Sequence, residues 1–252
     1  MKIITFNLRH HANRWEERLP LVIAELLREN ADVIAFQEVS LNLGPDNQAQ
    51  IIADRLNTLL TTSPYQVFFA EGKGYLKGKE GIALLSRHPI QRAERIKLPK
   101  KWRVAQRILI DLDGREIEIV NTHLHHLPLD DEKIRHPQAE ALLAWVQDRP
   151  VPTVIVGDFN AQPGSSTIEM LKTNYRSAFE AVHGNEPDFT WPTPLVAGTD
   201  GDGAPEMIDY IFFKPDQLTA TDCYLIGTQP PATDPTLYPS DHFGVAATFD
   251  FH

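Results

Sequence analysis

The chain has 252 residues, of which 42% are hydrophobic and 23% are charged; this ordinary globular composition excludes a disordered or fibrous protein. No apolar run reaches the roughly 18 residues of a membrane-spanning helix, and no export signal is visible at the N-terminus, so a cytoplasmic location is expected. The net charge of −10 disfavours a tight grip on long nucleic acid, which needs a basic face, and favours a small or weakly held substrate.

The first part of the chain alternates strands and helices. The apolar run over residues 3–6 predicts a strand at the N-terminus. In residues 15–30, Leu19, Val22, Ile23 and Leu26 recur at helical spacing, and residues 31–39 predict a buried strand. A second amphipathic helix is predicted over residues 48–60.

A strand-rich middle follows. Strands are predicted over residues 65–70, 81–86, 104–112 and 117–124, and the turn Asp113-Gly114 joins the last two because glycine tolerates positive φ. Later residues predict helices over 136–147 and 166–171 and strands over 153–157, 208–213, 223–226 and 245–251. Helices around a strand-rich middle favour two packed sheets covered by helices, in a single domain of residues 1–252.

Polar side chains collect at the ends of these predicted strands. They are Asn7, Gln37 and Glu38, Asn121 and His123, Asp158 and Asn160, Asp209, and Asp241 and His242. Any one of them is explained by the preference of such residues for turns. Their joint occurrence predicts one site on which they converge.

Six motifs occur in a characteristic order along the chain. They are Thr5-Phe6-Asn7-Leu8-Arg9, Phe36-Gln37-Glu38-Val39, Asn121-Thr122-His123-Leu124, Gly157-Asp158-Phe159-Asn160, Ile208-Asp209-Tyr210-Ile211-Phe212 and Ser240-Asp241-His242. This set resembles the endonuclease/exonuclease/phosphatase superfamily, over most of the chain. The resemblance implies an α/β fold, namely a four-layer α/β sandwich with two mixed β-sheets flanked by helices, and a divalent-metal site at one end.

Oxygen ligands from carboxylates and carboxamides suit Mg²⁺ or Mn²⁺. Glu38 is the best candidate for a direct ligand, both by the resemblance and by its chemistry, and the alternative is a salt bridge at a strand end. Asn7 is expected beside it, as a ligand or as a hydrogen-bond donor. Asp241 is expected to hold the same ion directly or through a water.

The resemblance also pairs Asp209 with His242. An aspartate that accepts a hydrogen bond from one imidazole nitrogen orients the ring, so His242 is predicted as general base or phosphate contact. Asp158 is a rival base that would align the attacking water. Asn160 is expected to donate to a phosphoryl oxygen, and His123 to contact the phosphate or protonate the leaving oxygen. The division of acid and base among His123, Asp158 and His242 stays open.

Arg9 marks a departure from one branch of the family, the apurinic endonucleases, which carry an acidic ligand at this position. Arg9 is instead predicted to bind phosphate, with a solvated surface arginine as the alternative. Trp191 lies before the Asp209 strand and is interpreted as core rather than as a wall of the site.

The motifs predict a phosphoesterase that depends on Mg²⁺ or Mn²⁺ and hydrolyses a phosphodiester or phosphomonoester by direct attack of water. Its partner would be a phosphorylated small molecule, lipid headgroup or nucleic acid, and no obligate protein partner is evident. The alternative is a catalytically silent phosphate-binding module that keeps the fold. Such a module would be expected to have lost charged site residues, whereas all six motifs keep theirs.

Overall fold

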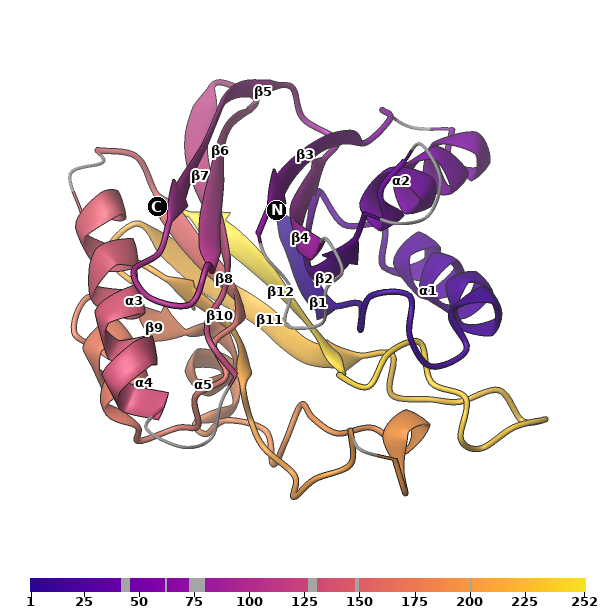
Figure 1. Ribbon diagram of the computed structural model, residues 1–252. Helices are drawn as coiled ribbons and strands as arrows, with labels where there is room; N and C mark the ends of the chain where they lie inside the picture. The colour runs from indigo at the N-terminus through magenta and orange to yellow at the C-terminus, as the bar shows by residue number, and fades with distance from the viewer. Residues whose placement is uncertain (42–45, 62, 73–79, 127–130, 148–149, 200) are drawn as a thin grey trace.

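The computed structural model describes residues 1–252 except 42–45, 62, 73–79, 127–130, 148–149 and 200. Within this part of the chain, two six-stranded sheets pack face to face and helices cover the outer face of each (Figure 1). The arrangement is a four-layer α/β sandwich with two mixed sheets, so the predicted fold class is confirmed.

The first sheet is built from both ends of the chain. Its order is β11-β12-β1-β2-β4-β3, with β1 (Lys2–Asn7), β2 (Val33–Ser40), β3 (Gln66–Glu71), β4 (Glu80–Ser86), β11 (Leu218–Ile226) and β12 (Gly244–Phe251). β1 and β2 are parallel, and Asn7 pairs with Gln37. The other neighbours in this sheet are antiparallel. The parallel pair brings the polar ends of β1 and β2 to one edge.

The second sheet comes from the middle of the chain. Its order is β5-β6-β7-β8-β10-β9, with β5 (Ile90–Lys97), β6 (Val104–Leu112), β7 (Arg115–His123), β8 (Thr153–Asp158), β9 (Arg176–Ser177) and β10 (Asp209–Phe213). β7 and β8 are parallel, with His123 opposite Asp158, and β10 runs antiparallel to β8, with Asp209 opposite Asp158. Three polar residues therefore lie in one row across this sheet.

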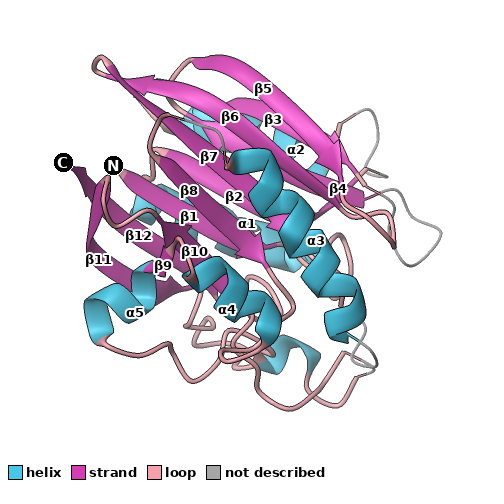
Figure 2. Cartoon of the chain, turned by 90° about the vertical axis from the view of Figure 1, so that its left-hand side faces the viewer, coloured by secondary structure: helices cyan, strands magenta, loops and turns pink. Residues whose placement is uncertain are grey.

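Four helices cover the outer faces of the two sheets. α1 (Trp15–Glu29) and α2 (Gln48–Leu59) cover the first sheet, while α3 (Asp131–Val146) and α4 (Ser166–Lys172) lie on the other side (Figure 2). α5 (Ala178–His183) instead packs against the core between the sheets and contacts β11. The apolar stripe predicted in α1 packs against β1 and β2 through Val22 and Leu26. No helix in the described ranges is long and apolar enough to cross a membrane.

Several elements depart from the sequence prediction. β5, the two-residue strand β9 and α5 were not predicted; β5 is an edge strand whose residues are mostly exposed, so it lacks an apolar face to signal it. Helix α3 begins at Asp131, ahead of the predicted start at 136, and continues through Pro137. Proline cannot donate to the carbonyl four residues earlier. That carbonyl, of Lys133, accepts a hydrogen bond from the ammonium group of Lys100 instead.

A polar bridge joins the two sheets in their otherwise apolar interface. The amide of Asn121 in β7 donates to the carbonyl oxygens of Phe36 and Ala83 in the first sheet, both at 3.0 Å. Gln37 in β2 donates to the Asn121 side-chain oxygen at 2.8 Å and to Thr5 Oγ1 at 3.0 Å. All these side chains are buried. Because a buried amide is costly without partners, this bridge fixes how the sheets lie on each other.

Gly157 allows β7 and β8 to approach closely just before Asp158. Its φ is +146°, and a Cβ atom at this position would lie 2.0 Å from the carbonyl oxygen of Thr122. No side chain fits at that distance, so the glycine of the Gly-Asp-Phe-Asn motif is required by packing as well as by backbone conformation.

We expect Gly157→Ala to lower the free energy of unfolding by about 3 kcal/mol or more, because strain and overpacking add. Urea denaturation of the purified chain measures the loss. The matched control is Gly114→Ala, whose glycine also has positive φ but where an added Cβ would meet no other atom within 4 Å. Equal losses in the two variants would contradict the packing explanation.

Candidate active site

The predicted polar residues gather at one end of the two sheets. His123, Asp158 and Asp209 are neighbours in the second sheet. Asn7 at the end of β1 donates from Nδ2 to Asp158 Oδ2 at 2.9 Å, across the space between the sheets. The segment before β12 brings His242 to the same place, with its Nε2 4.0 Å from Asp158 Oδ2. Residues from five strands or their flanking segments therefore converge.

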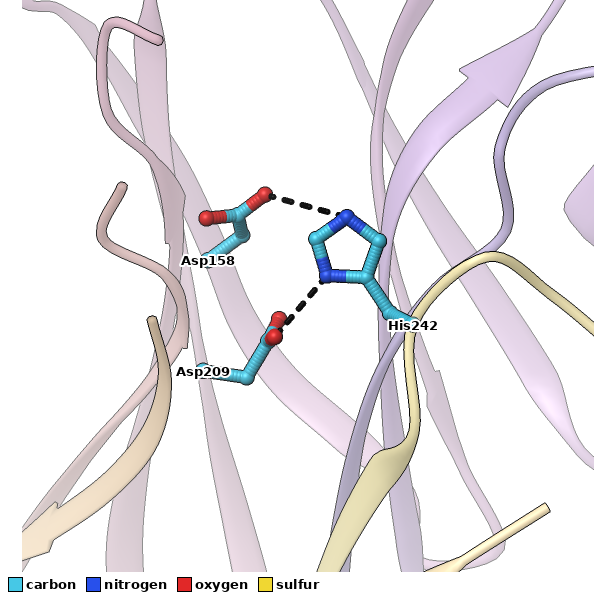
Figure 3. Close-up of side chains that lie close together, drawn as sticks. All are labelled: Asp158, Asp209 and His242. Atoms are coloured by element: carbon cyan, nitrogen blue, oxygen red, sulfur yellow. Dashed lines mark hydrogen bonds and ion pairs between the residues drawn. The ribbon is translucent and has the colours of Figure 1, made fainter. Parts of the chain in front are cut away.

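Asp209, His242 and Asp158 form a chain of contacts (Figure 3). His242 Nδ1 lies 2.8 Å from Asp209 Oδ2, and its Nε2 faces Asp158. The hydroxyl of Thr190 donates to the same Asp209 oxygen at 2.6 Å and accepts from the backbone N–H of Ile208 and Asp209. Asp209 is thereby fixed, and it orients the imidazole of His242.

The protonation of this chain follows from its burial and charges. Burial lowers the pKa of His242, but the charges of Asp209 and Asp241 and the Asp209 hydrogen bond outweigh it and raise that pKa to about 10. Burial and the nearby charge of Asp209 raise the pKa of Asp158 to about 7. At neutral pH His242 therefore favours the imidazolium and Asp158 is the member of the pair able to accept a proton, and because the two groups interact their titration belongs to both together.

Asn160 follows Asp158 in a left-handed turn, with φ of +49°. Its backbone N–H donates to Asp158 Oδ1 at 2.9 Å, and its side-chain amide donates to the carbonyl of Leu124 at 3.2 Å. The amide nitrogen carries two hydrogens. One bond to Leu124 therefore orients the group and leaves it able to donate to a substrate oxygen.

Glu38 sits on a β-bulge of β2, where its backbone has φ of +51°. The bulge turns the carboxylate towards the convergent site, where Oε2 lies 3.7 Å from Nε2 of His10. Burial raises the pKa of Glu38, but the charges of His10, Arg9 and His242 outweigh it and lower that pKa. Glu38 Oε2 is buried and accepts no hydrogen bond from any residue that the structure describes.

Asp241 lies beside this carboxylate and is held from two sides. Its Oδ2 is 3.3 Å from Nη1 of Arg9, and its Oδ1 accepts from the hydroxyl of Ser240 at 3.2 Å. The backbone N–H of Arg9 in turn donates to Asn7 Oδ1 at 2.9 Å. Asn7, Arg9 and Asp241 thus form one connected group, and Arg9 is part of the site rather than a solvated surface residue.

Two sets of side chains are close enough together to be considered for a metal ion. In the described residues, ligand atoms of Asp158, Asp209 and His242 lie within 4.8 Å of one another. The contact with Asp209 favours the protonated form of the His242 imidazole, and a protonated imidazole cannot ligate a metal. The Glu38 carboxylate is ionised, and its buried Oε2 accepts no hydrogen bond from the described residues, so it fits a hard divalent cation better.

Arg103, just before β6, contacts the other histidine of the site. Its Nη1 is 3.0 Å from His123 Nδ1, and its Nη2 is 3.0 Å from His126 Nδ1. Glu80 Oε1 lies 3.5 Å from the same guanidinium. His123 Nε2 is 3.5 Å from Asp158 Oδ2. His123 and His242 therefore both direct Nε2 at the same oxygen of Asp158.

Arg18 of α1 holds the backbone that carries Arg9 and Asp241. Its fully buried guanidinium donates to five backbone carbonyl oxygens, those of Leu8, His10, Ala12, Asn13 and Pro239. Burial lowers the pKa of Arg18 to about 10, so it stays charged at neutral pH. The segment after β1 and the segment before Asp241 are thereby tied to one side chain.

A cleft of about 740 Å³ opens onto this group of residues. Arg9, Glu38, Asp158, Asn160 and His242 line its inner end. Trp191 forms part of its wall, with Gly203 packed against the indole ring, so the interpretation of Trp191 as core was wrong.

All the predicted site residues lie around this cleft or directly behind it, while their chemical roles stay predictions. The sequence reasoning missed Arg18, Thr190 and Arg103 as supports of the site. Arg18 lies on the apolar face of α1, three residues after Trp15 and four before Val22. An arginine at this helical spacing must be buried, so the spacing is a signal that the sequence alone could have given. Thr190 and Arg103 have no comparable local signal.

Comparison with known proteins shows the family and the fold of the chain. The family model described as "Endonuclease/Exonuclease/phosphatase family" matches residues 4–242. Nocturnin of Drosophila melanogaster is 28% identical to the chain, over 94% of this chain and 42% of that protein. The chain spans 42% to 66% of the length of the curated Nocturnin proteins it matches.

Solved structures share the fold over the whole chain. An endonuclease/exonuclease/phosphatase family protein from Leptotrichia buccalis superimposes with a TM-score of 0.81 at 20% identity, with both chains fully covered. The human Nocturnin catalytic domain with bound sulfate gives a TM-score of 0.77 at 23% identity, over 100% of this chain and 94% of that one.

We expect Arg18→Met to lower the free energy of unfolding by at least about 3 kcal/mol, because several buried carbonyls would lose their donor at about 1–3 kcal/mol each. Urea denaturation measures the change. Arg28→Met is the control in the same helix, since its side chain is 66% exposed and a surface ion pair is worth about 0–1 kcal/mol. A loss in Arg18→Met no larger than in Arg28→Met would refute the inference that Arg18 holds the two backbone segments in place.

Proposed function

The chain belongs to the endonuclease/exonuclease/phosphatase family, and on that premise we propose that it is a divalent-metal-dependent phosphoesterase that acts by direct attack of water. The observation that carries the proposal is the Asp209–His242–Asp158 chain together with the buried Glu38 oxygen, which accepts no hydrogen bond from the described residues, at one cleft. The substrate is a phosphodiester or phosphomonoester of a nucleic acid, a small molecule or a lipid headgroup.

Glu38 is the proposed direct ligand of Mg²⁺ or Mn²⁺, with Asn7 and Asp241 as further oxygen donors. The ion when bound would neutralise charge on the phosphoryl oxygens and help to align substrate and water. Support comes from the chemistry of the donors, which are two carboxylates and a carboxamide. The neighbouring Arg9 and His10 keep Glu38 ionised and ready to bind a cation.

Asp158, paired with the imidazolium of His242, is proposed to take up the proton of the attacking water. Asp209 holds the imidazole of His242 through Nδ1, so Nε2 faces the Asp158 carboxylate. Asn7 and the backbone of Asn160 hold the two oxygens of Asp158 in place. A positioned base of this kind is worth about 10²–10⁴-fold in rate.

Arg9, Asn160 and His123 are the proposed contacts of the phosphate. Arg9 and Asn160 line the same cleft as Asp158 and can offer N–H donors to phosphoryl oxygens. Nε2 of His123, like Nε2 of His242, faces Oδ2 of Asp158. An anionic substrate would thus meet donors from both sheets.

A catalytically silent phosphate-binding module is the second candidate. The retained proton-transfer pair and the buried Glu38 carboxylate favour an enzyme, since simple phosphate binding needs neither. We also propose that residues 1–252 form a single domain, because strands from both chain ends share the core between the sheets with the middle strands. A cytoplasmic location and the lack of an obligate partner stay predictions from the sequence.

The activity is tested with bis(4-nitrophenyl) phosphate and 4-nitrophenyl phosphate, each with Mg²⁺, with Mn²⁺ and with a chelator. We expect turnover of at least one ester, a loss of at least about 10²-fold with chelator, and recovery when the ion is restored. Turnover that chelation leaves unchanged would contradict the metal role. Binding of phosphate without hydrolysis of any ester would favour the silent module.

Glu38→Gln tests the ligand assignment, because the neutral amide keeps the shape of the side chain and removes its charge. We expect a rate loss of at least about 10²-fold at the metal concentration that saturates the wild type, and weaker Mn²⁺ binding by calorimetry. Glu140→Gln, in an exposed position of α3, is the control. Unchanged Mn²⁺ affinity in Glu38→Gln would remove Glu38 from the ligands.

A further inference from the structure

The guanidinium group of Arg103 bridges two imidazole rings at the edge of the site. Its Nη1 and Nη2 each lie 3.0 Å from an Nδ1 atom, of His123 and of His126 respectively. The Arg103 side chain is 11% exposed and that of His123 is 4% exposed. The surrounding protein therefore fixes this contact and shields it from water.

A single arrangement of hydrogens satisfies both contacts. A guanidinium carries five N–H donors and no acceptor, and it keeps its proton in proteins. Each Nδ1 atom must therefore accept a hydrogen bond from Arg103. An imidazole whose Nδ1 accepts is neutral and carries its hydrogen on Nε2. Both His123 and His126 are thus held in this tautomer.

The Nε2–H group of His123 faces the proposed reaction centre. Its nitrogen lies 3.5 Å from Asp158 Oδ2 and is buried, without a hydrogen-bond partner among the described residues. A buried donor without a partner is costly. An oxygen atom of a substrate that enters beside Asp158 would satisfy it.

We propose that Arg103 is a positioning residue that holds His123 as a neutral Nε2–H donor to a phosphoryl oxygen. The functional meaning of this inference rests on the proposed phosphoesterase activity, whereas the tautomer does not. A neutral donor stabilises charge on the oxygen by a hydrogen bond and keeps its own hydrogen. His123 is thereby removed from the candidates for general acid, and the leaving oxygen takes its proton from another group.

Among the other charged and titratable groups around His123, the two carboxylates favour the charged ring and the three histidines disfavour it. They are Glu80 from β4, Asp158 from β8, His242 from the segment before β12, and His125 and His126 from the segment after β7. Burial first, and then the charge of Arg103, lower the pKa of His123 well below its ordinary value. An imidazolium there would also direct an Nδ1–H at the N–H groups of Arg103.

Long-range ¹H–¹⁵N correlation NMR of the histidine-labelled chain identifies the nitrogen that carries hydrogen. The His123 signals are assigned from the spectrum of His123→Gln. In the wild type we expect a neutral Nε2–H ring between about pH 8 and about pH 5. In Arg103→Met we expect a mixture of tautomers and a pKa higher by at least about one pH unit.

Two further variants separate the effect of Arg103 from a general disturbance. Arg103→Lys keeps a cationic donor, so we expect it to retain the Nε2–H form of His123. Arg95→Met removes an exposed arginine from neighbouring β5 and should leave the His123 signals unchanged. A wild-type His123 that carries hydrogen on Nδ1, or titrates near its ordinary pKa, would overturn the inference even if Arg103→Met fails to fold.

Kinetics test whether the positioning matters for turnover. We expect Arg103→Met to lower kcat by roughly 10- to 100-fold, since removing a preorganised donor outright costs about 10²–10³-fold. We also expect a new ionisation in the acidic limb of its pH profile. An active Arg103→Met enzyme with the wild-type profile would refute the positioning role. Absence of any turnover in the wild type would refute the proposed function and leave the NMR result standing.

Discussion

The candidate site depends on a constraint that lies behind it, the polar bridge between the two sheets. Asn121 and Gln37 place amide groups in an interface that is otherwise apolar, and each finds partners across the gap. An apolar contact would allow one sheet to slide on the other at little cost, whereas a shift here would leave buried amides unpaired. The bridge therefore sets the relative position of the sheets. Because of it, Asn7 from the first sheet can reach Asp158 in the second at 2.9 Å.

Buried cations stabilise the segments that extend beyond the strand ends. Arg18 ties the segment after β1 to the segment before Asp241 through carbonyl oxygens, and Arg103 joins the segment after β7 to β4. Loops that carry functional groups need such supports, because only rigid neighbours hold side chains within a fraction of an ångström. The guanidinium of Arg18 makes five directed bonds at once, more than the three N–H groups of a lysine could donate.

Local sequence patterns predicted the parts of the structure that local forces determine. Apolar runs located most strands, and polar residues at their ends located Asn7, Glu38, Asp158 and His242. The edge strand β5 was not predicted because its residues are mostly exposed. The start of α3 was placed too late because the Lys133 carbonyl accepts its hydrogen bond from Lys100, which is far away in the sequence. Arg103 and Thr190 could not be found for the same reason, since their partners lie about 20 residues away along the chain. Gln37 and Asn121 belong to recognised motifs, yet their role as a bridge between sheets is visible only in three dimensions.

The two histidines that face Asp158 show how the site assigns different chemistry to identical side chains. Both rings are buried, and burial alone would make both neutral. His242 has Asp209 at Nδ1, and the carboxylate outweighs burial and favours the imidazolium. His123 has Arg103 at Nδ1, and the guanidinium adds to burial and favours the neutral ring. The partner at Nδ1 thus sets the charge that each Nε2 presents to Asp158. With the two rings in opposite states, Asp158 is left as the group able to accept a proton, the imidazolium of His242 supplies a positive charge beside it, and His123 only donates a hydrogen bond.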